Sequence, residues 1–327
     1  MLRLPPFRYH RPATVADAVA VMGEHPGHAM YVAGGTDLVP NMKHRLFEPD
    51  HLVALRGIDE LRGVREDNGS LCIGAAETLG AVASHPRVRE LFPALATAAG
   101  HVAGPQLRNA GTIGGNVCLD TRCTYYNQTA FWRDALGYCL KKDGDVCHVT
   151  RVGKKCVAAH SAETPPVLMT LGASVTLVGA QGTREVPVGD FFVADGIANT
   201  RRAPDEIVTE VRVPLASSGL RQAYAKLRQR KSIDFPLLTV AVAADLDGGE
   251  VRAIEGVVTA LGSRPRALTG WSDIAVGRRL DDDVIDELAE RAHEQCHPLE
   301  NIIVDPDWRR AMVPVYVRRA LRELSAA

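Results

Sequence analysis

Two glycine-rich stretches decide how this chain folds: AGGTDL at residues 33–38 and NAGTIGGN at residues 109–116. The first lies between a strand-like run at 30–33 and a helical repeat that begins at Leu38. Glycines let a backbone approach a phosphate closely, and successive N–H groups at a helix start stabilise its charge. Neither stretch has the glycine spacing of a dinucleotide fingerprint or the lysine of a Walker loop. Together they suit a pyrophosphate held from two sides, although two unrelated turns would give the same pattern.

The residues around the first stretch predict a small parallel sheet. Residues 14–23 form a helix in this interpretation, with Thr14 as its cap and Gly23 as its stop. A strand at 30–33, a helix at 38–46 and a strand at 51–55 follow. Such strand, helix, strand units build parallel sheets. One face of the first helix carries four apolar residues: Val15, Ala18, Val19 and Met22.

The remaining chain mixes strands and helices, which predicts an α+β fold. Residues 56–117 alternate short strands with helical stretches, and residues 173–188 hold two alternating strand candidates around a turn. Residues 215–220 form a candidate linker. Beyond it, residues 224–262 indicate antiparallel strands with a turn at Asp247-Gly248-Gly249, and the last 55 residues are mostly helical.

The composition is that of a soluble globular protein of about two domains. The 327 residues are 46% hydrophobic and 24% charged, with 38 basic against 39 acidic side chains. This balance argues against a nucleic-acid-coating surface. The N-terminal residues lack the features of a secretory signal, and no stretch approaches the ~20 apolar residues of a membrane span. We therefore expect a cytoplasmic protein.

Five of the seven cysteines crowd into 39 residues, from Cys118 to Cys156. Four of them, Cys123, Cys139, Cys147 and Cys156, are separated by 15, 7 and 8 residues, unlike the paired cysteines of zinc ribbons. Four thiolates can hold zinc or a [4Fe–4S] cluster, or they can stay free. Cys118 directly follows the second glycine stretch and is the spare thiol in this interpretation.

The segment 118–160 that carries these cysteines reads as an insertion without regular structure. It has seven Lys/Arg against four Asp/Glu, and positive charge would offset a thiolate site. It also holds five of the 17 aromatic residues, which could wrap a cofactor in apolar surface. These aromatic residues are Tyr125, Tyr126, Phe131, Trp132 and Tyr138.

Four segments in this order resemble the FAD-binding subunits of the xanthine dehydrogenase and carbon monoxide dehydrogenase group of molybdenum hydroxylases. They are AGGTDL (33–38), AGTIGGN (110–116), PPVLMTLGA (165–173) and YAKLRQRKSIDF (224–235). The resemblance covers nearly the whole chain. It implies a vanillyl-alcohol-oxidase-type FAD-binding fold of two α/β subdomains, followed by a C-terminal domain with a three-stranded antiparallel sheet and helices. The implied boundaries are 1–55, 56–216 and 217–327.

The insertion is similar to that of the β subunits of 4-hydroxybenzoyl-CoA reductases, which binds an additional [4Fe–4S] cluster. This likeness favours iron–sulfur over zinc for Cys123, Cys139, Cys147 and Cys156. Carried over residue by residue, it also implies an FAD site. The implied FAD-binding residues are Ala33, Gly34, Gly35, Thr36, Asp37, Leu38, Gly111, Thr112, Gly114, Gly115, Asn116, Glu163 and Lys226. Glu163 stands where relatives usually have Asp, and Lys226 without the resemblance would be an ordinary exposed strand lysine.

The resemblance implies an electron-transfer subunit with no catalytic residue of its own. A ferredoxin-like donor would reduce the [4Fe–4S] centre, and FAD would pass electrons to a [2Fe–2S] subunit and a molybdopterin-containing catalytic subunit, in a heterotrimer that dimerises. Two alternatives stay open: an oxidative hydroxylase subunit that delivers electrons to NAD or a quinone, and a non-redox module with structural zinc. The basic insertion suggests a docking face for an acidic donor, formed by Lys141, Lys142, Lys154 and Lys155.

Overall fold

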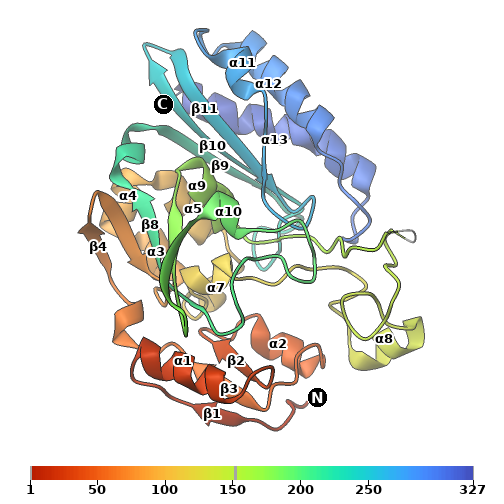
Figure 1. The fold of residues 1–327 in the computed structure, drawn as a ribbon. Coiled ribbons are helices and arrows are strands. Elements are labelled where there is room, and N and C mark those ends of the chain that lie inside the picture. The colour runs from red at the N-terminus through yellow and green to blue at the C-terminus, as the bar shows by residue number, and fades with distance from the viewer. Residues whose placement is uncertain (1, 151–152, 327) are drawn as a thin grey trace.

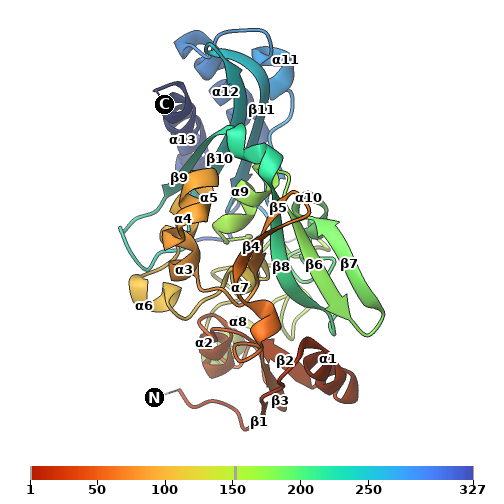
Figure 2. The same cartoon turned by 90° about the vertical axis from the view of Figure 1, so that its left-hand side faces the viewer.

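The computed structural model describes residues 2–150 and 153–326 and arranges them in three layers, each built around one sheet (Figure 1). The N-terminal layer has a three-stranded sheet, the middle layer a five-stranded sheet and the C-terminal layer a four-stranded sheet. Figure 2 shows the five-stranded sheet between the other two. The α+β class is confirmed.

The first layer is the parallel sheet that the sequence predicts. Its strands are β1 (Arg8–His10), β2 (Ala29–Val32) and β3 (His51–Ala54), in the order β1-β3-β2. Helix α1 (Val15–Glu24) begins at Thr14, whose side chain accepts a hydrogen bond from the Asp17 N–H, and the four predicted apolar residues are buried. The helix continues through Gly23, so the predicted stop is wrong: a single glycine weakens a helix without ending it. Helix α2 (Leu38–Lys43) follows the first glycine stretch.

The second layer is an antiparallel sheet in the order β4-β5-β8-β6-β7. Its strands are β4 (Val64–Asp67), β5 (Ser70–Gly74), β6 (Ser174–Gly179), β7 (Gly182–Pro187) and β8 (Ile207–Pro214). Residues 79–100, within the region where helical stretches are expected, form three short helices, because prolines begin two of them. The helices of this layer are α3 (Leu79–Ser84), α4 (Pro86–Leu91), α5 (Pro93–Gly100), α6 (Pro105–Arg108), α7 (Ile113–Val117), α9 (Thr164–Thr170) and α10 (Val188–Phe191).

The third layer packs helices on one antiparallel sheet, as predicted, with a short fourth strand added. The strands are β9 (Arg221–Leu227), β10 (Leu238–Asp247), β11 (Glu250–Thr259) and β12 (Arg266–Ala267). Gly248 and Gly249 form the predicted turn with φ of 57° and 93°, a backbone region that favours glycine. The helices are α11 (Trp271–Ala275), α12 (Asp282–Gln295) and α13 (Pro306–Ala326), and short 3₁₀ turns lie at Asp59–Leu61 and Leu215–Gly219.

The insertion lies beside the body, between the first and third layers (Figure 1). It contains helix α8 (Ala130–Leu136), which Thr129 caps, so the expectation of no regular structure is wrong for these residues. Its contacts reach both layers, because Tyr126 packs on Leu46 and the Thr124 N–H donates to the Asn301 carbonyl. Among the described helices, none combines the length and apolarity needed to cross a membrane.

Candidate functional site

The two glycine stretches touch each other. A Cβ added to Gly34 would lie 2.1 Å from the carbonyl oxygen of Ala110, and one added to Gly111 would lie 3.2 Å from Thr36 Oγ1. Gly35 has φ of +68°, which turns the backbone from β2 into α2. The glycines are therefore required for the two loops to meet.

Only the first loop keeps a run of free backbone donors. Within the described chain, the N–H groups of Gly34, Gly35 and Thr36 have no hydrogen-bond acceptor. In the second loop, the Gly114 N–H donates to the Ala75 carbonyl at 3.0 Å, and the Gly115 N–H donates to a threonine hydroxyl. The free N–H groups of the first loop suit an anion such as a diphosphate. In the second loop, Gly114 also packs closely on Ala75, where an added Cβ would lie 2.6 Å from the alanine Cβ.

Three predicted site residues meet in one buried network. Glu163 accepts hydrogen bonds from Asn116 Nδ2 at 3.2 Å and from Lys226 Nζ at 2.8 Å. The Thr164 N–H and hydroxyl donate to Asn116 Oδ1 at 3.1 and 2.7 Å. These side chains come from α7, the start of α9 and β9, so the network joins the second and third layers.

Lys226 is far from an ordinary exposed strand lysine. Its side chain is 1% exposed, and Nζ also donates to the carbonyl oxygens of His101 at 3.0 Å and Asp234 at 2.8 Å. Burial raises the pKa of Glu163, while the charge and hydrogen bond of Lys226 oppose that shift. Every donor of the ammonium group thus has a partner, and the network is rigid.

Asp37 connects the first glycine loop to the insertion. Its carboxylate accepts hydrogen bonds from Arg122 Nη1 and Asn41 Nδ2, both at 2.9 Å. Burial raises the pKa of Asp37, and the Arg122 charge opposes the shift. The Arg122 guanidinium also lies 4.0 Å from the ring centre of Phe235, so one arginine links the loop, the insertion and the β9–β10 connection. Leu38 starts α2 and packs in the apolar cluster of the first layer.

A cavity of about 230 Å³ opens beside these residues. It borders the network, because the Asp234 backbone that lines it accepts a hydrogen bond from Lys226. Its lining includes Arg122, Cys123, Ser161, Asp234, Phe235 and Leu237. The cavity thus borders the insertion directly. It is connected to the first loop and to the buried ion pair through two hydrogen bonds, from Arg122 to Asp37 and from Lys226 to the Asp234 carbonyl.

The four predicted cysteine ligands line a second, smaller cavity inside the insertion. Cys123, Cys139, Cys147 and Cys156 converge there from separate loops, with Tyr126 and Lys141 in the same wall, and the volume is about 20 Å³. Cys118 does not line it. Cys123 also lines the larger cavity, so one sulfur-bearing residue is shared by the two.

Hydrogen bonds favour a thiolate at one of these cysteines. Burial raises the pKa of Cys147, but donors at Thr150 and at the backbone of Val149 and Val157 outweigh it, and the pKa is lowered. Burial raises the pKa of Cys123 to about 11 and also raises that of Cys156. The backbone N–H of Ala158 donates a hydrogen bond to the Cys156 sulfur at 3.5 Å.

One zinc ion would need the cysteine sulfurs to move closer together. Over residues 2–150 and 153–326, no three of them lie within 4.8 Å of one another. Sulfurs on a tetrahedral zinc would be about 3.8 Å apart, given Zn–S bonds of about 2.3 Å. In a [4Fe–4S] cluster each sulfur binds a different iron, so the sulfurs stand farther apart.

Two expectations for the insertion are wrong. Lys141 is 5% exposed and bonds Asp120 Oδ1 at 2.6 Å, so it is unavailable for docking. Phe131 is 85% and Trp132 is 39% exposed, and neither of them lines the cysteine cavity. Tyr126, at 2% exposed, does cover the cysteine cavity. Arg151, part of the predicted positive charge, lies outside the described residues.

Comparison with known families decides the class of protein. Residues 5–216 match the family described as FAD binding domain in molybdopterin dehydrogenase, and residues 222–324 match the CO dehydrogenase flavoprotein C-terminal domain. The chain belongs to this family of molybdenum hydroxylase flavoproteins. It is an FAD-binding oxidoreductase subunit, as predicted.

Curated relatives of this flavoprotein align with most of its length. The carbon monoxide dehydrogenase medium chain of Hydrogenophaga pseudoflava is 31% identical and aligns over 97% of this chain and 96% of its own. The aldehyde oxidoreductase FAD-binding subunit of Escherichia coli (strain K12) is 32% identical over 77% of this chain and 81% of its own. A solved structure of carbon monoxide dehydrogenase from Hydrogenophaga pseudoflava superposes with a TM-score of 0.82 at 29% identity, covering 99% of both chains.

Several residues of the site escaped the sequence analysis. Arg122 carried no local signal, since its role depends on contacts with Asp37 and Phe235. Asp234 and Phe235 lie within the YAKLRQRKSIDF segment that carried the resemblance, which was the available hint. The carbonyl of His101 has no side-chain signature at all.

Proposed function

We propose that this chain is the FAD and [4Fe–4S] electron-transfer subunit of a molybdenum-containing aromatic-CoA reductase of the 4-hydroxybenzoyl-CoA reductase class. The observation that carries the proposal is the convergence of four cysteines on one cavity within the insertion. The substrate's chemistry would take place on a partner subunit. No residue of this chain would contact the hydroxyl group that is removed.

FAD, when bound, accepts electrons in pairs and releases them singly. The residues of this chain would position it. The free N–H groups of the first glycine loop fit its diphosphate, and the cavity beside Phe235 offers apolar and polar walls for a ring. The thirteen predicted FAD-binding residues are proposed as that site. Within it, the Glu163–Lys226 network would hold the wall rigid.

Cys123, Cys139, Cys147 and Cys156 are the proposed ligands of the cluster. Their donor chemistry fits it, since four thiols share one cavity. The cavity is small, so the cysteine side chains would have to move outward when a cluster is assembled. Because Cys123 borders both cavities, the two cofactors would approach each other most closely at this residue.

The proposed partners are a [2Fe–2S] subunit and a molybdopterin-containing subunit, in a heterotrimer that pairs into a dimer. A ferredoxin-like protein is the proposed donor. Relatives named as medium chains, such as that of carbon monoxide dehydrogenase, support a multi-subunit assembly.

The experiment is cofactor analysis of the complex purified without oxygen. We expect about four irons per flavin beyond those of the [2Fe–2S] subunit, and a reducible low-temperature EPR signal. In Cys147→Ser these irons should be lost while flavin remains. In the matched control Cys118→Ser, which changes a cysteine outside the cavity, they should stay. Absence of these irons, together with zinc that is lost in Cys147→Ser, would refute the cluster and favour the non-redox alternative.

A second candidate is the flavin subunit of an oxidative hydroxylase that sends electrons to NAD or a quinone. The relatives favour it, since they include carbon monoxide dehydrogenases and an aldehyde oxidoreductase. Assays of the complex separate the two. Reduction of 4-hydroxybenzoyl-CoA by a low-potential donor supports the first, and oxidation of an aldehyde or heterocycle with NAD or a quinone supports the second.

A further inference from the structure

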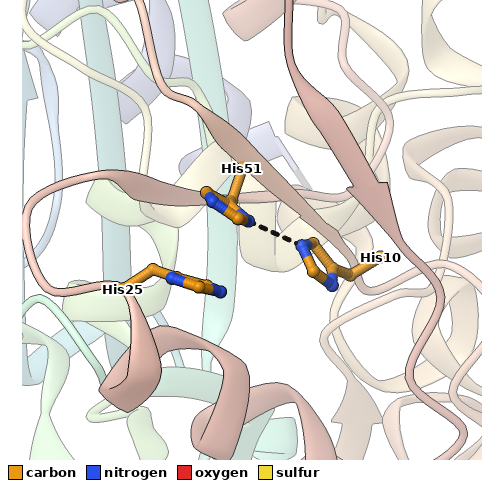
Figure 3. Close-up of side chains that lie close together, drawn as sticks. All are labelled: His10, His25 and His51. Atoms are coloured by element: carbon orange, nitrogen blue, oxygen red, sulfur yellow. Dashed lines mark hydrogen bonds between the residues drawn. The ribbon is translucent and has the colours of Figure 1, made fainter.

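Three histidines form a cluster in the first layer, separate from both cavities (Figure 3). His10 ends β1, His25 directly follows α1 and His51 begins β3. One ring nitrogen from each lies within 4.8 Å of the other two, and all three residues are partly exposed. Neither proposed cofactor uses these residues.

The rings are held face to face with their nitrogens close together. His10 Nε2 and His51 Nδ1 share a hydrogen bond of 2.8 Å, and the ring of His25 stacks on that of His51 with centres 3.6 Å apart. The ring nitrogens of His25 make no hydrogen bond with any described residue. The cluster therefore keeps lone pairs available to an incoming ligand.

We propose that His10, His25 and His51 bind a divalent transition-metal ion of the kind that prefers imidazole, such as zinc. Three histidines and a water complete a tetrahedral zinc site. Zn–N bonds of about 2.0–2.1 Å would place the nitrogens about 3.4 Å apart. The stacked rings of His25 and His51 would therefore have to turn so that their in-plane lone pairs point at one ion. Coordination replaces the hydrogen bond between His10 and His51. The ring that donated in that bond changes tautomer, so each neutral ring then carries its proton on the nitrogen that does not bind the ion.

Two neighbouring features favour a cation there. His25 stands at the C-terminal end of the ten-residue helix α1, where the helix dipole is negative. The Asp50 carboxylate adjoins His51 in the sequence and binds His28 at 2.8 Å. Arg8, which pairs with His51 in the sheet register, opposes a cation, so the net preference depends on the imidazole ligands themselves.

A bound ion would clamp the layer that carries the first glycine loop. It would join β1, the end of α1 and β3, which are otherwise connected by backbone pairing and apolar packing. Strand β1 has only three residues and lies at the sheet edge, so it gains most from the link. The ion would thus stabilise the first layer in proportion to its occupancy.

The test is titration of the full-length chain with Co²⁺, followed by visible and near-ultraviolet absorption. Cobalt held by nitrogen ligands shows d–d bands without the intense sulfur-to-cobalt charge-transfer band, which separates this site from the cysteines. We expect the wild-type chain to bind one equivalent of Co²⁺ that shows these d–d bands. His25→Ala and His10→Gln should each bind it at least tenfold more weakly, and the exposed His297→Ala should match the wild type.

These variants should fold, because the capping contact of His25 uses its backbone N–H, which donates to the Met22 carbonyl. As a second measurement, Zn²⁺ should raise the thermal unfolding midpoint of the wild-type chain and leave that of His25→Ala unchanged. Equal binding by the wild type and His25→Ala, binding with the thiolate band alone, or no binding by the folded wild type would each overturn the site.

Discussion

Lys226 Nζ and Glu163 Oε1 lie 2.8 Å apart, and their side chains are only 1% and 3% exposed. Lys226 comes from β9 of the third layer, whereas Glu163 precedes α9 of the second. The pair therefore connects two layers in the interior. Asn116, at the end of the second glycine loop, completes the contact.

Removing one partner of this pair should be costly. Lys226→Met leaves the Glu163 carboxylate buried without its counter-charge, and we expect a loss of about 3–5 kcal/mol in the free energy of unfolding. The double variant Lys226→Met/Glu163→Gln removes the charge and keeps an acceptor for Asn116, so it should recover most of that loss. Urea unfolding checks both. A double variant as unstable as Lys226→Met would contradict this account.

Gly34→Ala should separate the two glycine loops. Its Cβ would lie 2.1 Å from the Ala110 carbonyl oxygen, so the backbone must move, and we expect purified protein with little bound flavin. The control is Gly23→Ala, whose Cβ would meet nothing within 4 Å in α1. That variant should keep its flavin and gain about 0.5–1 kcal/mol in stability. Flavin absorbance per chain gives the result, and full flavin content in Gly34→Ala would count against the site.

His160 should make the chain sensitive to acid. It is fully buried, and burial lowers its pKa from 6.5 to about 3. Protonation below pH 6.5 then favours the unfolded chain, so stability is complete above 6.5 and falls toward pH 3 by about 1.4 kcal/mol per pH unit. His160→Phe would place an aromatic ring beside Phe192. It should reduce the pH dependence of the free energy of unfolding by the contribution of one proton.

Unfolding measured between pH 5 and 7 tests the role of His160. The exposed His28→Ala serves as the control and should keep the wild-type slope. A slope unchanged in His160→Phe would show that other groups cause the acid sensitivity.

Donor docking should depend on the exposed lysines of the insertion. Lys154 and Lys155 are exposed, so Lys154→Glu/Lys155→Glu should slow reduction by an acidic donor about tenfold at low ionic strength, with the difference vanishing in high salt. Stopped-flow reduction measures the rate. Arg89→Glu, on α4 at the opposite side in Figure 1, should have no effect. Equal slowing by both changes would argue against a local docking face.

Local patterns predicted much of the fold because they depend on near neighbours in the chain. The apolar face of α1, its cap at Thr14 and the turn at Gly248 and Gly249 all follow from spacing and backbone preference. Two local features were not predicted: the division into helices at the prolines that begin α4 and α5, and the strand β12. One proline or a two-residue strand is too short a signal to outweigh the pattern of the surrounding residues.

The two glycine loops, the number of thiols and the resemblance to a family could all be established from the order of the amino acids alone. Three other relationships became visible only in the folded chain: Lys226 is buried against Glu163, Arg122 joins Asp37 to the insertion, and Lys141 is buried against Asp120. The convergence of the four cysteines on one cavity and the clustering of three histidines are likewise visible only in the folded chain. These histidines are His10, His25 and His51. These relationships join residues distant in the chain, whose proximity is set by layer packing and which no local spacing encodes.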